Sequence, residues 1–249
     1  MEQAISIALS RQMMLRRAMD IVATNVANMN TAAYKVEAPM FSEYMMPTAE
    51  ADDRNGPGKT GNLSYVLDMG VHRDMSEGQI TQTGNPLDLA ISGDGYFAIQ
   101  TQAGERYTRS GHFSVDVDGQ LVTPQGHLVL SDAGAPITLN PEDGQVEISR
   151  DGTISAGEIT VGRIGVVTFD DPRGMKKMGD THLATDEAAR PLDTPNVIQG
   201  AIEGSNVKSM VEMTRMIDVM RAYTSTQRTI NKMGELQQSA IRQLGREPR

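Results

Sequence analysis

The sequence predicts an α+β protein in which helices at the two ends of the chain pair with each other and flank a central, mainly antiparallel β domain. Of the 24 glycines, 22 lie between residues 56 and 204, and glycine inside a helix costs about 1 kcal/mol relative to alanine. Methionine is distributed in the opposite way, with 13 of 17 in residues 1–46 or 210–233. Formal charge is +6 over the two ends together, 1–35 and 205–249, and −15 between them. The two ends are therefore expected to be helical and to belong together.

Residues 1–34 are predicted to form the N-terminal helix of an inner domain, because apolar residues recur there in steps of three and four, as in the seam of a coiled-coil-like helix. A second apolar row lies roughly 110° around the helix. The main row is Ile5, Ala8, Gln12, Leu15, Met19, Val22, Val26 and Met29, and the second is Ala4, Ile7, Met14, Ala18 and Ile21. Two adjacent rows exceed what one partner helix covers. We interpret them as an assembly surface; the alternative is an ordinary core helix.

The middle of the chain is predicted to contain an extended linking arm over residues 35–79, a compact β domain over 80–190 and a return linker over 191–204. Pro47, Gly56, Pro57 and neighbouring polar residues indicate loop within the arm. Short β-favouring runs follow, separated by Asp-Gly pairs that are typical of hairpins. These runs are Leu87–Ile91, Gly95–Gln100, His112–Val117, His127–Leu130, Val146–Ile148 and Arg163–Phe169.

Residues 205–249 are predicted to form the C-terminal helix of the inner domain, with Ser205 as a candidate N-cap. A helix over 205–244 is about 60 Å long, too long to lie across a domain of this size. Its apolar stripe consists of Met210, Met213, Ile217, Met220, Tyr223, Ile230, Met233, Ile241 and Leu244. The expected fold is thus a helical stalk joined to a β domain.

Composition excludes several classes of function. The chain has no cysteine and therefore no disulfide, thiolate metal site or cysteine nucleophile. Its four histidines are not spaced like metal ligands, and Gly93–Ala98, which fits a dinucleotide fingerprint, begins a strand instead of a helix. No stretch has the length and apolarity of a membrane span, and Arg11, Arg16 and Arg17 interrupt any secretory signal. We predict no catalytic, metal or cofactor residue, and the acidic chain is a poor partner for nucleic acid.

Motifs at both ends and in the middle of the chain resemble the axial proteins of the bacterial flagellum, the rod and hook family. The N-terminal helix ends in an asparagine-rich turn, followed by an aromatic and a basic residue, and the central match extends almost without gaps from Gly78 to Gly126. The turn carries Asn25, Asn28, Thr31, Tyr34 and Lys35; the central motif includes Gly84, Asn85, Pro86, Leu87, Asp88, Gly93, Gly95, Tyr107, Arg109 and Gly111. Ala33 departs from the glycine usual in the family, which leaves the turn conformation open because alanine resists positive φ.

The resemblance implies a structural subunit of the basal-body rod, located in the periplasm and exported by the flagellar type III apparatus without a cleaved signal peptide. It also implies terminal segments that order as helices when copies and related rod subunits assemble into a tube that transmits torque. The expected interface comprises Ile5, Ile7, Ala8, Met14, Leu15, Met19, Ile21, Val22, Val26, Met29, Met210, Met213, Ile217, Met220, Tyr223 and Ile230. The alternatives are a distal-rod or hook subunit of the same family, a cell-wall hydrolase, or a secreted binding module.

Overall fold

A computed structural model describes residues 2–47, 62–140, 144–179 and 181–244 and divides the chain into two compact units. The helical unit comprises Met1–Ala27, Glu37–Arg73 and Lys208–Arg249, and the β unit comprises Asn28–Val36 and Asp74–Val207. Terminal helices and a central antiparallel β domain are both present, so the predicted α+β class is confirmed.

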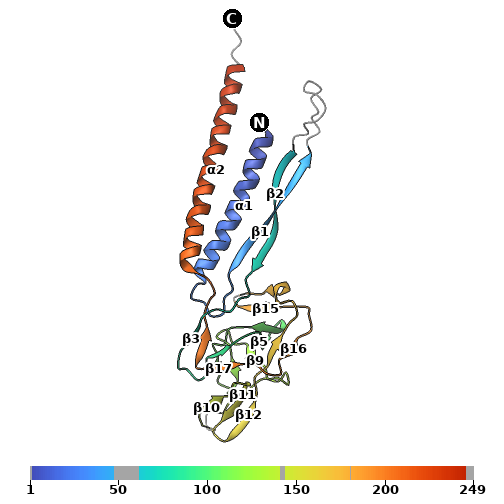
Figure 1. The fold of residues 1–249 in the computed structure, drawn as a ribbon, viewed down its shortest axis with the longest axis vertical. Coiled ribbons are helices and arrows are strands. Elements are labelled where there is room, and N and C mark those ends of the chain that lie inside the picture. Colours follow the sequence, from blue (N-terminus) through green and yellow to red (C-terminus); the bar gives the residue numbers. More distant parts are fainter. Residues whose placement is uncertain (1, 48–61, 141–143, 180, 245–249) are drawn as a thin grey trace. The chain divides into compact units, whose positions relative to one another are not determined.

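The helical unit is built on two long helices that run antiparallel to each other (Figure 1). Helix α1 spans Glu2–Ala27 and helix α2 spans Ser209–Leu244. Side chains across the pair give the register: the Gln12 amide donates to Gln227, and Asn25 Nδ2 donates to Glu212 Oε2 at 2.9 Å. Neither helix, within the described ranges, combines the length and apolar character needed to cross a membrane.

The segment predicted as a linking arm forms a hairpin that packs on α1 (Figure 1). Strand β1, Glu37–Pro47, pairs antiparallel with β2, Asn62–Arg73, with a register shift between Met40 and Phe41. A two-stranded hairpin is only marginally stable by itself, and here α1 supports it. Ser10 Oγ of α1 accepts a hydrogen bond from Val66 N–H of β2 at 3.4 Å. The sequence predicted an extended arm here but not a paired hairpin, because sequence patterning does not show that this segment packs on α1. Most of the predicted loop at 47–64 lies outside the described residues.

The β unit consists of short strands whose ladders, within the described ranges, are antiparallel. Its largest sheet has the order β14-β15-β6-β5-β9-β8-β7, with β13 joining β5 to β16; β10-β11-β12 form a smaller sheet. The bounds are β3 Ile80–Gln82, β4 Leu89–Ile91, β5 Tyr96–Thr101, β6 Gly104–Thr108, β7 Ser114–Val115, β8 Leu121–Val122, β9 Leu128–Val129, β10 Val146–Ile148, β11 Thr153–Ala156, β12 Ile159–Arg163, β13 Val166–Thr168, the 3₁₀ turn η2 Pro172–Gly174, β14 Lys176–Lys177, β15 His182–Ala184, β16 Arg190–Pro191, β17 Val197–Gln199 and β18 Ala201–Glu203.

Aliphatic side chains form most of the core of the β unit, as a chain with only ten aromatic residues requires. Phe97 and Phe113 pack edge to face within it, with ring centroids 5.2 Å apart. A smaller cluster gathers Tyr96 and Tyr107 around Phe169. The predicted strand runs supply part of this core, including Leu89, Phe97 and Ile164, but other buried residues lie outside those runs. These are Leu121, Ile137, Leu139, Ile154 and Val197 in the larger cluster and Tyr107, Met175 and Leu183 in the smaller one.

The expected return linker, residues 191–204, is part of the sheets instead of a connection. Strand β17 pairs with β4, and β18 pairs with β3, which brings the end of the central region back to its beginning. The two strands have three residues each, and runs this short carry no periodic signal. Ser205 does not cap α2: its hydroxyl accepts from Val207 N–H at 3.2 Å in the turn that precedes the helix.

Candidate functional site

The apolar rows predicted on α1 face two partners, α2 on one side and the β1–β2 hairpin on the other. Leu15, Ala18, Ile21 and Val22 are buried. The half-buried members are Ile5, Ile7, Ala8, Gln12, Met14, Met19 and Val26. The side chain of Ala4 lies outside the described part, and Met29 is half-buried in the turn after the helix. Two apolar residues outside both rows, Leu9 and Met13, are exposed at 50% and 61%.

The single stripe predicted on α2 divides into two faces. Tyr223, Ile230 and Met233 are half-buried, whereas Met210, Met213, Ile217 and Met220 are exposed at 76%, 44%, 51% and 49%. The division follows from helix geometry, because each step of three residues falls about 60° short of a full turn. The two successive steps from Ile217 to Tyr223 therefore rotate the stripe onto the covered side. Ile241 is exposed, and the side chain of Leu244 lies outside the described part.

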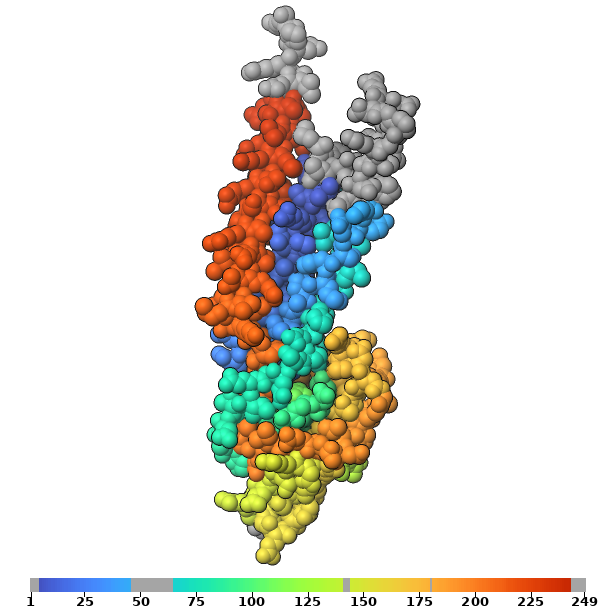
Figure 2. All heavy atoms as spheres, viewed as in Figure 1, coloured from blue at the N-terminus to red at the C-terminus, as the bar shows by residue number. Residues whose placement is uncertain are grey.

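The four exposed residues, Met210, Met213, Ile217 and Met220, form what we call the α2 patch. Half-buried residues of the same helix, among them Val219 and Ala222, lie roughly 140–160° around the helix from the centre of the patch at about 100° per residue. Figure 2 shows a long surface of α2, in orange and red, that α1 and the hairpin leave open. Contiguous exposed apolar residues of this kind mark interaction surfaces.

Asn25, predicted as a turn residue, lies inside α1 and is fully buried. Its Nδ2 donates to the Glu37 carbonyl at 2.8 Å as well as to Glu212, and its Oδ1 accepts from Glu37 N–H at 3.0 Å. Glu212 is also buried and accepts from Arg215 Nη1 at 2.8 Å. One asparagine thus joins α1, β1 and α2 within the helical unit.

The asparagine-rich turn adopts the conformation that the sequence left open. Ala33 has φ of 56°, in the left-handed region that disfavours alanine. Its N–H donates to the Glu203 carbonyl at 2.8 Å, and Thr31 closes the turn with N–H to Asn28 O at 3.1 Å and a side-chain bond to Asn28 Oδ1 at 3.0 Å. The substitution of alanine for glycine is therefore accommodated, with the strain offset by these bonds.

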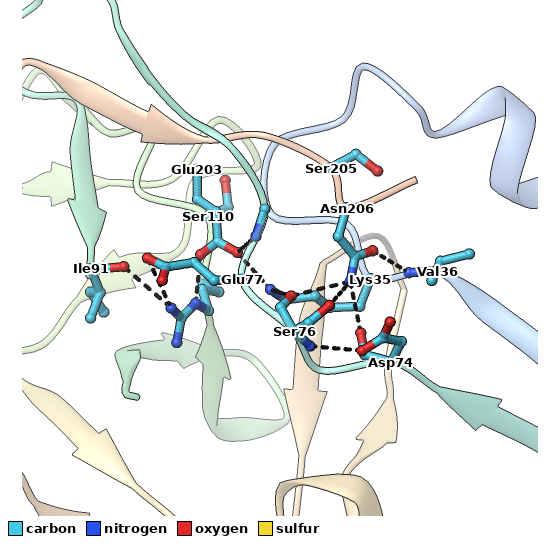
Figure 3. Close-up of polar contacts among 12 residues, drawn as sticks. Lys35, Val36, Asp74, Ser76, Glu77, Ile91, Ser110, Glu203, Ser205 and Asn206 are labelled. Carbon is cyan, nitrogen blue, oxygen red and sulfur yellow. Dashed lines mark hydrogen bonds and ion pairs between the residues drawn. The ribbon is translucent and has the colours of Figure 1, made fainter. Parts of the chain in front are cut away.

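Lys35 and Arg109 both bind the fully buried carboxylate of Glu203. Figure 3 shows Lys35 and Glu203 among the surrounding polar contacts. Lys35 Nζ lies 2.5 Å from Oε1, and Arg109 Nε lies 2.5 Å from Oε2. Arg109 also donates to the carbonyls of Gly95 at 2.9 Å and Gly93 at 2.5 Å. We call Lys35, Arg109 and Glu203 the ion cluster. It brings together residues from the predicted turn and from the predicted central motif.

Burial governs the electrostatics of the ion cluster. Burial lowers the pKa of Lys35, while the hydrogen bond and charge of Glu203 act in the opposite direction. Lys35 also donates to the Ser76 carbonyl at 2.7 Å, and Gly78 N–H donates to Glu203 Oε1 at 2.9 Å. A Cβ at Gly78 would lie 2.0 Å from the Gly204 carbonyl oxygen, so the close approach of these two segments requires glycine.

The central motif forms a turn organised by Asp88, which is buried. Its carboxylate accepts from Thr83 Oγ1 at 2.7 Å and Asn85 Nδ2 at 3.1 Å, and it lies 2.7 Å from His112 Nδ1. Gly111, in the same motif, leaves no room for a side chain because a Cβ would lie 1.7 Å from the Leu89 carbonyl oxygen.

Tyr107 is a further member of the motif. Burial raises the pKa of its phenol to about 12, and Glu105 adds to the effect. The other members, Gly84, Pro86 and Leu87, complete the turn, with Leu87 packed against the core.

The structure also contains functional candidates that sequence reasoning missed. Glu203 and Asn206 are not among the predicted site residues, yet Glu203 is the buried anion of the ion cluster. A lone glutamate in a short strand carries no sequence signal of burial. Among the described residues, no group of three or more His, Cys, Asp or Glu side chains is arranged to hold a metal ion.

Comparisons with known proteins match both ends and the centre of the chain to flagellar rod and hook proteins. Three family models match: "Flagella basal body rod protein" over residues 5–35, "Flagellar hook protein FlgE/F/G D1 domain" over 90–156, and "Flagellar basal body rod FlgEFG protein C-terminal" over 198–243. The chain is 42% identical to flagellar basal-body rod protein FlgF of Caulobacter vibrioides over 248 residues, covering 99% of each chain. It is 33% identical to FlgF of Mesorhizobium japonicum, covering 98% of this chain and 99% of the relative. It is 32% identical to the rod protein FlgG of Bacillus subtilis, with 90% and 92% covered.

Proposed function

The chain belongs to the family of flagellar basal-body rod proteins, and from this premise we propose that it assembles into the rod through the α2 patch and the other apolar surfaces of its terminal helices. The family is structural, so the chain is a component of the flagellum and not an enzyme. The observation that carries the proposal is the exposure of four large apolar side chains on one face of α2.

The α2 patch favours another subunit as its cover. Its residues are exposed, whereas Val219 and Ala222 on another face of α2 are half-buried, and α2 packs against α1. Full burial of an exposed side chain of this size is worth about 1.5–3 kcal/mol. The four are 44–76% exposed, so covering them yields roughly half of that for each and still provides a substantial part of an interface. Methionine suits a contact between related but non-identical subunits, because its flexible side chain adapts to different partners.

A helical tube is the assembly that such contacts favour. A head-to-tail contact repeated with a rotation that does not close generates an open helix of subunits. We propose that copies of this chain and other rod subunits cover the α2 patch and the exposed Leu9 and Met13 of α1 in an inner layer, with the β units attached to it. Such a tube transmits torque because each subunit is held by several neighbours.

Among rod proteins, we propose the FlgF type and the proximal part of the rod. The higher identity to relatives named FlgF, 42% against 32% for a relative named FlgG, supports this choice over a distal-rod or hook subunit. We further propose export through the flagellar type III apparatus to the periplasm without a cleaved signal peptide, and no partnership with nucleic acid.

Locating a labelled copy of the chain in purified basal bodies tests this function. An epitope tag inserted at the hairpin turn between β11 and β12, at Gly157, places the label on the β unit without touching either helix. Antibody density in the rod is the expected result. Labelled protein that is exported but absent from basal bodies would contradict the proposal.

A further inference from the structure

The chain passes between the helical unit and the β unit at four peptide bonds, which follow residues 27, 36, 73 and 207. Inside the β unit, Asn206 forms hydrogen bonds with the segments next to two other crossings, after residues 36 and 73, and itself lies next to the crossing after residue 207 (Figure 3). Asn206 Oδ1 accepts from Val36 N–H at 2.7 Å, and Nδ2 donates to the Asp74 carbonyl at 2.9 Å. Its own N–H donates to the Tyr34 carbonyl at 3.2 Å, so one asparagine bonds all three segments.

The same segments are also anchored from the interior of the β unit. Lys35 precedes the second crossing by one residue and is bound to Glu203, which lies three residues before Asn206. Tyr34 is buried, and Lys177 Nζ lies 4.6 Å from the centroid of its ring. The backbone adds two further bonds, from Asp74 N–H to Val36 O at 3.0 Å and from Ala33 N–H to Glu203 O at 2.8 Å.

We propose that Asn206 and the Lys35–Glu203 pair form a latch that keeps residues 33–36, 74–76 and 203–206 together whether or not α1 and α2 are folded. Every partner named above belongs to the β unit, so the latch draws its stability from that unit alone. In this arrangement Asn206 and Glu203 are positioning residues for the segments that lead into the terminal helices.

The latch deepens the proposed function, on which its biological use rests. Terminal helices that are partly ordered in the free subunit and complete their folding during assembly lose conformational entropy at that moment. When residues 33–36, 74–76 and 203–206 are already held together in the free β unit, their conformational entropy is not lost again during assembly. This reduction of the entropy cost is the general benefit of preorganisation. The latch would thus make incorporation easier without adding any contact between subunits.

Hydrogen exchange of the free, full-length subunit tests the latch, with the amides of Ala33 and Asp74 as reporters. The acceptors of these two N–H groups are backbone carbonyls that no proposed variant removes. In Leu15→Asp, which puts a charge into the packed face of α1, the reporters should keep the protection of the wild type while α1 amides exchange faster. In Asn206→Ala, reporter protection should fall at least about tenfold, the effect of losing two to three hydrogen bonds. Core amides of Phe97 and Ile99 should be unchanged.

Two further variants make the outcome decisive. Glu203→Gln should also lower the exchange protection of the Ala33 and Asp74 amides. If Glu203→Gln unfolds the whole β unit, the test rests on Asn206→Ala, which leaves no unpaired buried charge. Asn140→Ala, at an exposed asparagine of the same unit, is the matched control and should have no effect. Reporters that lose protection together with α1 in Leu15→Asp, or that keep it in Asn206→Ala, would overturn the latch. Strong exchange protection of α1 in the wild-type free subunit would contradict the proposal that the helices complete their folding during assembly. It would leave the latch to be judged by the exchange of the Ala33 and Asp74 amides in Asn206→Ala.

Discussion

At the scale of single residues, the structure depends on a few buried polar side chains at which distant parts of the chain meet. Glu203 is the clearest case, because its two carboxylate oxygens serve Lys35 and Arg109, which lie 168 and 94 residues away in sequence. Buried ion pairs of this kind contribute little net stability compared with apolar residues, but the loss of one member leaves the others buried and uncompensated. The ion cluster therefore makes the β unit sensitive to single substitutions.

Replacing Glu203 with glutamine should destabilise the β unit by roughly 3–5 kcal/mol. Lys35 and Arg109 stay buried, and their remaining counter-charge is the partly exposed Glu77, 3.9 Å from Arg109 Nη2. Urea unfolding followed by near-UV circular dichroism measures the change. Asp186→Asn is the control, since the Asp186 side chain is fully exposed beside Lys176, and its effect should stay within about 0.5 kcal/mol. An equally small change in the free energy of unfolding for Glu203→Gln would show that the β unit does not depend on the ion cluster for its stability.

Tyr107 gives a pH dependence of defined sign. With its pKa raised to about 12, the folded phenol keeps its proton between about pH 10 and 12, whereas the unfolded phenol loses it. The folded state then binds more protons, so the free energy of unfolding falls as pH rises through this window. Urea unfolding at about pH 9.5 and 11.5 should show a decrease on the order of 1–2 kcal/mol in the wild type relative to Tyr107→Phe. An equal pH dependence in the two proteins would refute this.

At the scale of elements, α1 is covered on two sides, by α2 and by the β1–β2 hairpin. The heptad spacing predicted the helix and its apolar rows. The rows were interpreted as an assembly surface, whereas in the structure α2 and the hairpin of the same chain cover much of them. The hairpin itself could not be predicted as a partner, because strand patterning shows alternation and not the surface on which a strand packs. Likewise, β17 and β18 owe their formation to pairing with β4 and β3, contacts that are remote in sequence.

Leu15→Asp should reduce the helical content of the free chain, because it places a charge among the buried residues of α1. Far-UV circular dichroism measures the loss, and the near-UV signal of the β unit should remain. Ala23→Asp adds the same charge at an exposed position of the same helix and is expected to retain wild-type helicity within a small change in propensity. Equal far-UV spectra for the two variants would show that the packing of Leu15 does not stabilise α1.

At the scale of the whole molecule, the sequence motifs of both ends and of the centre converge on one family, and the comparisons confirm it. The fold class and most central strands were predictable because they depend on local composition and turn chemistry. Which face of α2 stays open was not, since the stripe rotates along the helix and only the position of α1 decides which part is covered. Glu203 and Asn206 were missed because their role depends on partners far away in the chain.

The central claim is that the terminal helices present apolar surface that other subunits cover. Competition between tagged Ile217→Asp and untagged wild-type protein for places in basal bodies tests it most directly. Ile217 is 51% exposed in the subunit, so the variant should fold and be exported normally yet be strongly depleted from purified rods. Ser225→Asp, which adds the same charge on an exposed polar flank of α2, should incorporate like the wild type. Undiminished incorporation of Ile217→Asp would contradict the account.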